Sequence, residues 1–345
     1  MTKAFFKKRP ILIAEISANH NGDLNKAKKL ISLAKENGAD AVKLQTFTPS
    51  GMTLNHKGTD FKIKVGAWKD KYLWDLYLKA QTKLEWHKEL FAHAKKNKII
   101  CFSAPFHEEA VDFLEKLKCP IYKIASFEIT DLELIKYIAL KKKPMIISTG
   151  LSTLEEIDSA YDTAYKYGNK NISLLYCVSS YPAPITDFNL NNIKIMKQRY
   201  NCTIGLSDHS TDSDVAKAAI SSGAEIIEKH IKLPGDKSSL DSKFSLSTDK
   251  LREFKTEIEK VFKMLGEKSF HRTGNEKINK IFRRSIYVAS DIKKGEIFNK
   301  NNIKKIRPGY GGNLINYKKL IGKKNLFNLK FGSRLGNKLI KKILN

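Results

Sequence analysis

Eight short apolar segments recur along this chain, and a stretch with the periodicity of an amphipathic helix follows nearly every one. The segments are Ile11–Ile16, Ala41–Gln45, Ile99–Ser103, Ile121–Ser126, Met145–Thr149, Ser173–Cys177, Thr203–His209 and Ile226–His230. Eight strand–helix units in succession are typical of a closed parallel barrel. We therefore predict an α/β protein whose residues 1–266 form a (β/α)8 TIM barrel.

The sequence changes character after Gly266. Residues 267–281 are polar and contain Gly274, which predicts a linker. From residue 282 to 345, short alternating runs at Ser285–Ala289 and Ile303–Ile306 flank a turn at Lys294-Gly295. These runs predict a small β-rich domain of about 60 residues, which is marginal alone and should pack on something larger.

A long segment, Thr48–Thr82, separates the second predicted strand from its helix. Strand-to-helix connections usually take about two to six residues. In a barrel, an insertion there lies on the catalytic face and can close over a substrate. A surface excursion anchored by Trp68 and Trp74 is the alternative.

The chain carries a formal net charge of +27, with 63 Lys and Arg against 36 Asp and Glu. No nucleic-acid-binding motif accompanies the lysines, so we expect no nucleic-acid partner, although anionic substrates would benefit from the field. No apolar run approaches the roughly 20 residues that span a bilayer. We expect a cytoplasmic protein that does not bind membranes. The four cysteines form no C-x-x-C pair and are predicted to be buried thiols.

Polar residues that can take part in catalysis or ligand binding end the predicted strands. They are Glu15, Lys43, Gln45, Ser103, Lys123, Ser126, Ser148, Ser207, Asp208, His209, Glu228 and His230. Barrel enzymes place their active sites at the carboxyl ends of the strands, so these residues are the candidate site.

Two histidines end the last two strands, which are neighbours in a barrel. Ser207 and His209 lie two residues apart and share one side of a strand, as do Glu228 and His230. The two imidazoles can therefore meet and hold a divalent metal such as Mn²⁺, Zn²⁺ or Fe²⁺, leaving positions open for a substrate oxygen. Two strand-end histidines bonded to the backbone are the alternative interpretation.

Lys43 and Lys123 fall inside strands that should otherwise be apolar. An inward lysine is costly unless it meets an anion. With Gln45 and the serines at 126, 148 and 207, the two ammonium groups predict a cup for a phosphate and a carboxylate. Schiff-base chemistry at Lys123, or lysines that extend to solvent, remain alternatives. Three weaker candidates join them: Glu15 for sugar hydroxyls or a water, Tyr181 for a ring wall and Asp241 for hydroxyl or amide contacts.

These motifs resemble the sialic acid synthase family, whose members condense phosphoenolpyruvate with an amino sugar. The matching segments are Ala14–Gly22, Val42–Thr46, Tyr122–Ser126, Ser148–Gly150, Gly205–His209 and Ile227–His230. Arg284–Tyr287, Asp291–Glu296 and Arg307-Pro308 resemble the antifreeze-like (SAF) domain of that family. Asp60–Ile63, Leu73–Tyr77, Glu85–His87 and Asp241–Leu246 resemble the branch that makes pseudaminic acid.

The resemblance implies a transferase that joins phosphoenolpyruvate to 2,4-diacetamido-2,4,6-trideoxy-L-altrose. It implies a metal on His209 and His230, with Mn²⁺ first and Mg²⁺, Co²⁺ or Zn²⁺ as alternatives. It implies phosphoenolpyruvate contacts from Lys43, Lys123, Ser126, Ser179 and Ser207, and sugar contacts from Glu15, Tyr181, Asp241 and Arg307, the last contributed by the partner of a domain-swapped homodimer. Either Glu15 or Glu128 would handle the water.

Two residues depart from the family pattern. Ala104 stands where relatives carry Thr or Ser, and Ser179 replaces an Asn. The loop after His230 also lacks the Arg-Pro-Gly-Pro-Asp string of N-acetylneuraminate synthases. Three alternatives stay open: a synthase for N-acetylneuraminic or legionaminic acid, a lysine-type barrel aldolase, and a nucleic-acid-binding module.

Overall fold

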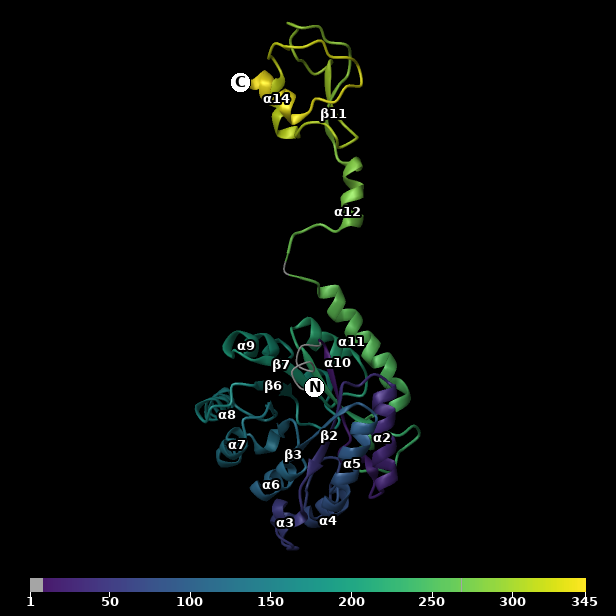
Figure 1. Ribbon diagram of the computed structural model, residues 1–345, viewed down its shortest axis with the longest axis vertical. Coiled ribbons are helices and arrows are strands. Elements are labelled where there is room, and N and C mark those ends of the chain that lie inside the picture. The colour runs from purple at the N-terminus through teal and green to yellow at the C-terminus, as the bar shows by residue number, and fades with distance from the viewer. Residues whose placement is uncertain (1–8, 268) are drawn as a thin grey trace. The chain divides into compact units, whose positions relative to one another are not determined.

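The computed structural model describes residues 9–267 and 269–345. The chain divides into two compact units, the first ending at Gly266 and the second spanning Glu267–Asn345. Figure 1 shows a barrel in the first unit and a smaller body in the second.

Eight parallel strands form the barrel and follow one another in chain order. They are β1 (Ile11–Glu15), β2 (Ala41–Thr46), β3 (Ile100–Pro105), β4 (Tyr122–Ile124), β5 (Met145–Ser148), β6 (Ile172–Cys177), β7 (Thr203–Asp208) and β8 (Ile226–Lys232). β1 pairs with both β2 and β8, which closes the ring. The predicted α/β TIM barrel is confirmed. A short strand, β9 (Leu246–Ser247), adds to the end of β8 and was not predicted.

Helices surround the strands (Figure 1). They are α2 (Leu24–Glu36), α5 (Leu84–Lys96), α6 (Glu108–Lys116), α7 (Leu132–Ala139), α8 (Leu154–Lys166), α9 (Asn191–Arg199), α10 (Asp214–Ser221) and α11 (Leu251–Leu265). Side-chain caps fix several starts: Asp131 accepts from the Leu134 amide, and Thr153 forms a capping box with Glu156. Within the described residues, no helix is long and apolar enough to cross a membrane.

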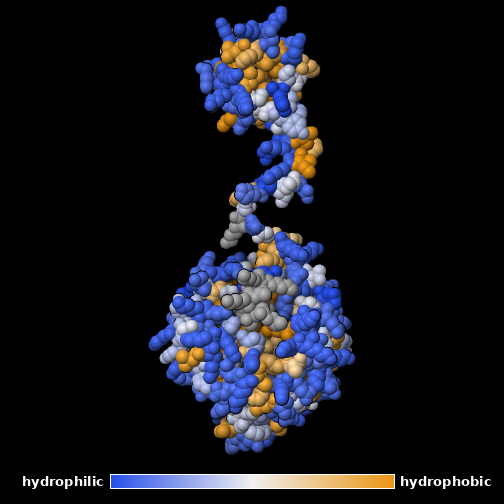
Figure 2. Space-filling model, viewed as in Figure 1, coloured by the Kyte–Doolittle hydropathy of each residue, from blue (hydrophilic) through white to orange (hydrophobic). Residues whose placement is uncertain are grey.

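The barrel core is apolar on both sides of the strands. All five residues of β1 are buried, because its inner face meets the other strands and its outer face meets the helices. Hydrophilic side chains cover most of the barrel face seen in Figure 2. Burial on both faces explains why the strands appear in the sequence as continuous apolar runs and could be located there.

The insertion between β2 and α5 contains structure of its own. It forms α3 (Pro49–Met52), the short 3-10 helix η2 (Thr59–Phe61) and α4 (Leu73–Ala80). Thr48 caps α3 by accepting from the Gly51 amide. Gly51 also allows a close approach, since a Cβ there would lie 2.3 Å from the His107 ring. The insertion is therefore packed onto the loop after β3.

The second unit has a small core of its own around Ile286, Phe298 and Leu335. Its strands β10 (Ser285–Val288) and β11 (Ile303–Ile306) pair antiparallel. The segment predicted as a linker contains α12 (Gly274–Ile278) and η7 (Asn279–Phe282), and the unit ends in α14 (Asn337–Leu344). Hydrophobic side chains reach its surface (Figure 2). They include Ile306, Tyr310, Ile315, Leu326, Phe327 and Phe331.

We predict that acid destabilises the barrel through His87. Its ring is buried between the Thr46 hydroxyl and the Lys83 carbonyl, and burial lowers its pKa to about 4. Because the unfolded chain takes up a proton near pH 6.5 while the folded state stays neutral, stability falls as pH drops from 6.5 to 4. This should cost roughly 3 kcal/mol.

Urea unfolding followed by tryptophan fluorescence measures this loss, since Trp68, Trp74 and Trp86 all lie in the barrel unit. His87→Gln, which cannot titrate, should show a shallower decline between pH 6.5 and 4 than the parent. Parallel declines in the two proteins would refute the assignment.

Candidate active site

A cavity of about 360 Å³ opens at the carboxyl ends of the barrel strands. Most of the predicted site residues line it together: Lys43, Gln45, Lys123, Ser126, Glu128, Ser148, Tyr181, Ser207, His209, His230 and Asp241. The strand register accounts for this convergence, because side chains at alternate positions of neighbouring strands point to the same interior.

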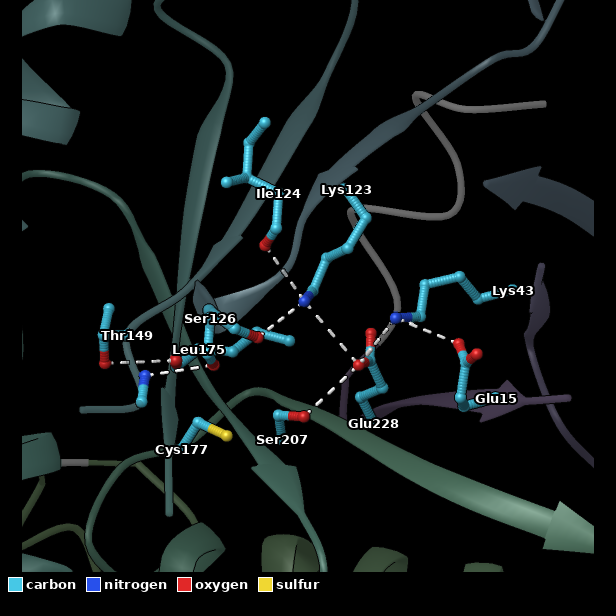
Figure 3. Close-up of polar contacts among 12 residues, drawn as sticks. Glu15, Lys43, Lys123, Ile124, Ser126, Thr149, Leu175, Cys177, Ser207 and Glu228 are labelled. Carbon is cyan, nitrogen blue, oxygen red and sulfur yellow. Dashed lines mark hydrogen bonds and ion pairs between the residues drawn. The ribbon is translucent and has the colours of Figure 1, made fainter. Parts of the chain in front are cut away.

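A buried charge cluster forms the floor of the cavity (Figure 3). The Lys43 Nζ atom lies 3.0 Å from Glu15 Oε2 and 3.1 Å from Glu228 Oε1. Burial alone would lower the Lys43 pKa, yet the two carboxylates raise it above its usual range. Lys43 therefore stays charged. The sequence predicted that this lysine contacts an anion, and the Glu15 and Glu228 carboxylates of the protein itself are in contact with it.

Glu15 and Glu228 behave differently although both contact Lys43. Burial raises the pKa of Glu15 to about 7 despite the neighbouring ammonium. Burial would also raise the pKa of Glu228, but Lys123 and Lys43 together hold it below its ordinary value. Glu228 is thus the firm negative charge of the cluster, and Glu15 is the group that gains or loses a proton near neutral pH.

Lys123 is the second buried ammonium. It donates to the Ser148 hydroxyl over 2.6 Å and to the Ile124 carbonyl over 3.2 Å, and its Nζ lies 3.7 Å from Glu228 Oε1. Burial lowers its pKa to about 8, and the charge of Lys43 adds to this effect. Lys123 therefore holds its proton less firmly than Lys43.

Serine hydroxyl groups lie beside the charge cluster and complete the polar part of the cavity. Ser126 accepts from the Gly150 amide over 3.1 Å, and Ser207 donates to Glu228 Oε1 over 3.3 Å. Gly150 must lack a side chain, since a Cβ there would lie 2.1 Å from the Ser179 hydroxyl. This close approach brings Ser126, Gly150 and Ser179 together, and Ser126 lines the same cavity as the two ammonium groups.

The two predicted metal ligands lie side by side, with imidazole centroids 5.3 Å apart. His209 Nδ1 donates to the Val178 carbonyl over 3.0 Å, which leaves Nε2 for another partner. His230 Nδ1 is buried without a hydrogen-bond partner, and burial holds its pKa well below the usual range. A neutral imidazole with an orphaned nitrogen suits a metal.

The described residues contain no group of three or more His, Cys, Asp or Glu arranged to hold a metal ion. Within the part of the chain that the structure describes, the Asp241 carboxylate approaches the histidines, with its Oδ2 4.0 Å from His230 Nδ1. That oxygen already accepts from the Ser17 hydroxyl over 2.6 Å. The donor set therefore fits a metal held by two protein ligands, with the other positions left for water or substrate.

Aromatic rings enclose the two imidazoles. Tyr181 lies 4.5 Å from His209, and Phe244 lies 5.0 Å from His230, centroid to centroid. Trp68 of the insertion contacts both, at 5.4 Å from Tyr181 and 6.2 Å from Phe244. Its indole also donates to the Leu240 carbonyl over 3.3 Å. The insertion thus reaches across the mouth to the loop after β8 and encloses the site.

The insertion also makes one side of the cavity apolar. Its contributions are Met52, Ile63, Trp68, Leu73, Leu76, Tyr77 and Ala80, and Phe47 and Phe106 flank them. Of the two interpretations of this segment, the structure supports the one in which it contributes to the site. The cavity accordingly has a charged, hydroxyl-rich end and an apolar end.

Five predicted residues do not line the cavity. Glu15 lies fully buried behind Lys43, Ser179 stands behind Gly150, and Arg307 belongs to the second unit, where it is exposed. Ser103 is buried against the Thr46 hydroxyl, and Asp208 is buried in an ion pair with Lys229. The structure adds residues that the sequence did not single out. Cys177, predicted as a buried thiol, is 5% exposed and lines the cavity, with its sulfur 3.9 Å from His209 Nδ1. Its position at an inward strand end was the signal that could have revealed it.

Comparison with known proteins decides the family. Residues 30–270 match the model of the NeuB family. The chain belongs to the NeuB family. It is 42% identical to pseudaminic acid synthase of Campylobacter jejuni, covering 95% of this chain and 96% of that protein. It is 43% identical to pseudaminic acid synthase of Helicobacter pylori, covering 91% and 93%.

A solved structure agrees with these relatives. The N-acetylneuraminic acid synthetase of Leptospira borgpetersenii aligns with a TM-score of 0.72 at 29% identity, covering 79% of this chain and 90% of that one. The family match spans the barrel segments that carry Lys43, Lys123 and both histidines. The chain is accordingly an enzyme of the phosphoenolpyruvate-dependent sialic acid synthase type.

We predict that the Glu15 carboxyl makes anion binding depend on pH. At pH 6 Glu15 is protonated and leaves Lys43 available, whereas at pH 8 it is ionised and competes with a bound anion. The dissociation constant of sulfate, whose own charge is constant over this range, should rise on the order of tenfold from pH 6 to pH 8.

Isothermal titration with sulfate measures this change. Glu15→Gln keeps the volume of the side chain and removes the titrating group, so it should lose most of the dependence. A variant whose affinity still falls with pH as steeply as the parent's would show that another group is responsible.

Proposed function

We propose that this chain is a pseudaminic acid synthase. It joins C3 of phosphoenolpyruvate to the aldehyde carbon of 2,4-diacetamido-2,4,6-trideoxy-L-altrose. Water adds to C2 of the former phosphoenolpyruvate, the C2–O bond breaks, and inorganic phosphate leaves. The products are pseudaminic acid and phosphate, and the atoms of both substrates and of one water are accounted for.

The observation that carries this proposal is the division of one cavity into a cationic end and an apolar end. Two lysines and several hydroxyls suit the phosphate and carboxylate of phosphoenolpyruvate. The apolar side suits a 6-deoxy sugar with two acetamido methyl groups, because such a sugar has a methyl group where other hexoses have a hydroxymethyl group. The identity to pseudaminic acid synthases supports the same substrate pair.

Lys43 and Lys123 act as the anion clamp in this proposal. Lys43 is held charged by its carboxylate partners, and Lys123 is held in place by Ser148 and Ile124. Both ammonium groups are ordered before substrate arrives, so little reorganisation accompanies binding. Ser126 and Ser207 line the cavity and supply further donors to the same anion, whereas Ser179 stands behind Gly150.

His209 and His230 would hold a divalent metal, Mn²⁺ in the first instance. Such a metal supplies Lewis-acid polarisation of the aldehyde oxygen, where negative charge develops as the new bond forms. The protein contributes the rest of the setting: the Val178 carbonyl fixes the His209 ring, and Tyr181 and Phe244 exclude water around both imidazoles.

Glu128 is the residue we propose to handle the water. It lines the cavity, its Oε2 is buried without a hydrogen-bond partner, and burial raises its pKa to about 7. Such a carboxyl can accept or return a proton near neutral pH. Glu15, by contrast, lies behind Lys43 and does not line the cavity.

For the second unit we propose an SAF-like domain that serves a partner subunit in a swapped homodimer. Its exposed Ile306 and Tyr310 flank Arg307, which is itself exposed. Burial of these side chains against a partner's barrel would remove apolar surface from water and bring the guanidinium to a sugar substrate. A biosynthetic enzyme with such substrates is proposed to act in the cytoplasm.

The proposal is tested by phosphate release from phosphoenolpyruvate with a panel of acetamido sugars. We expect turnover to be fastest with the 2,4-diacetamido-6-deoxy-L-altrose and at least tenfold slower with 6-hydroxy sugars, because a hydroxyl would be buried against apolar side chains. EDTA or His209→Ala should abolish turnover, and Mn²⁺ should restore it only in the parent protein.

The same assay separates the alternatives. A preference for N-acetylmannosamine or for the legionaminic acid precursor would reassign the substrate. Lys123, with its pKa near 8, is a feature that a lysine-type aldolase would share. Borohydride trapping of substrate on Lys123, together with full activity in EDTA, would replace the proposal with that chemistry.

We predict that Arg307 acts in trans. Arg307→Ala should lower kcat/KM for the sugar by roughly 10–100-fold, the worth of a hydrogen bond to a charged group, and leave the affinity for phosphoenolpyruvate unchanged. Mixing Arg307→Ala with the inactive His209→Ala variant, after dissociation and reassociation, should restore part of the activity. A mixture no more active than its components would refute the swapped arrangement.

A further inference from the structure

A fully buried ion pair lies beside the two histidines and takes no part in the reaction proposed above. Lys229 Nζ and Asp208 Oδ2 are 2.7 Å apart, and both side chains are completely excluded from solvent. Asp208 precedes His209, and Lys229 precedes His230. Asp208 and Lys229 are also register partners across β7 and β8.

Strand alternation separates this pair from the cavity. Glu228 and His230 line the cavity, so Lys229 between them points to the other face of β8, toward the helices. Its ammonium accordingly lies 5.7 Å from the ring of Phe254 in α11. The same pair of strand ends thus carries two imidazoles on the inner face and an ion pair on the outer face.

The ammonium also fastens the loop that follows His209. Lys229 Nζ donates to the Ser210 carbonyl over 2.6 Å and to the Ser210 hydroxyl over 3.1 Å. Asp208 Oδ1 in turn accepts from the Ser210 amide over 2.8 Å. The residues on both sides of His209 are therefore bound to one cation that is anchored in β8.

Stability alone does not account for this arrangement. A buried ion pair gains little over apolar side chains of similar volume, because desolvation offsets the attraction. What the pair provides is geometry, since its charge-assisted hydrogen bonds have short and directional contacts. The geometry that it fixes is the separation and direction of the strand ends that carry His209 and His230.

We propose that Lys229 and Asp208 are positioning residues that hold the two histidines at metal-binding separation from the outer face of the barrel. This inference rests on the metal site of the proposed function. The two side chains touch neither metal nor substrate. They act through the backbone of β7, β8 and the loop after His209.

A matched control exists at the opposite end of the barrel. Lys255 Nζ is buried and lies 2.7 Å from Asp40 Oδ2 and 2.9 Å from the Pro10 carbonyl. Pro10 and Asp40 precede β1 and β2, so this lysine fastens the amino ends of strands, away from the cavity. Lys255→Met should lower stability without altering the metal site.

The experiment titrates the full chain with Mn²⁺ alone and follows free Mn²⁺ by electron paramagnetic resonance. Lys229→Met and Asp208→Asn should each weaken Mn²⁺ binding by roughly 10–100-fold, as expected for residues that orient metal ligands. Lys255→Met should bind Mn²⁺ within about twofold of the parent, although its melting temperature falls comparably. The Lys229→Met/Asp208→Asn double variant should be little worse than either single one, because all three lose the same clamp.

Parent-like Mn²⁺ affinity in folded Lys229→Met would overturn the inference. If that variant does not fold, Asp208→Asn decides alone, because Asn keeps the volume and can still accept from Ser210. Phosphate release, measured separately, tests the proposed function. A parent protein that binds Mn²⁺ but releases no phosphate would refute that function and leave the inference standing, whereas one that binds no Mn²⁺ would overturn the inference whatever its turnover.

Discussion

The Glu228 carboxylate, shared by two buried lysines, is the interaction on which the site depends. Its Oε1 lies 3.1 Å from Lys43 Nζ and 3.7 Å from Lys123 Nζ. A barrel interior of this kind would not tolerate two ammonium groups without a carboxylate partner, because an unpaired buried charge costs several kcal/mol. With Glu228 in place, the cations are retained at the point where anionic substrate atoms are proposed to bind.

Much of the fold could be predicted because its determinants are local. Strands buried on both faces leave continuous apolar runs, and all eight barrel strands lie at the predicted positions within a few residues. The antiparallel pair β10–β11 was located from its short alternating runs. Prediction failed where tertiary context decides: the two-residue strand β9 was not located, because it is defined by its pairing with the end of β8.

The candidate site could be predicted only in part, for a physical reason. Strand ends identify which side chains share the mouth of a barrel, so both lysines and both histidines were found. The ion-pair partners of these side chains depend on which residues face one another across the interior of the barrel. Glu228 looked like a flank of the metal site, and its role as counter-ion emerges only from its distances to Lys43 and Lys123. Phe244 comes from the loop after β8, and much of the apolar wall comes from α4, a helix within the insertion whose placement over the cavity depends on tertiary packing.

Lys43 and Lys123 differ in pKa, and this difference bears on the proposed catalysis. Lys43 has two carboxylate neighbours and a pKa above its usual range, so it is a permanent cation. Lys123 is desolvated, with a pKa near 8, and gains most from a new negative charge. In the proposed reaction, the phosphate of an arriving substrate would strengthen the hold of Lys123 on its proton, while Glu15 could take up a proton and release Lys43 from one of its partners. The site would then exchange internal ion pairs for contacts with substrate, and charges already in place would offset the loss of water on binding.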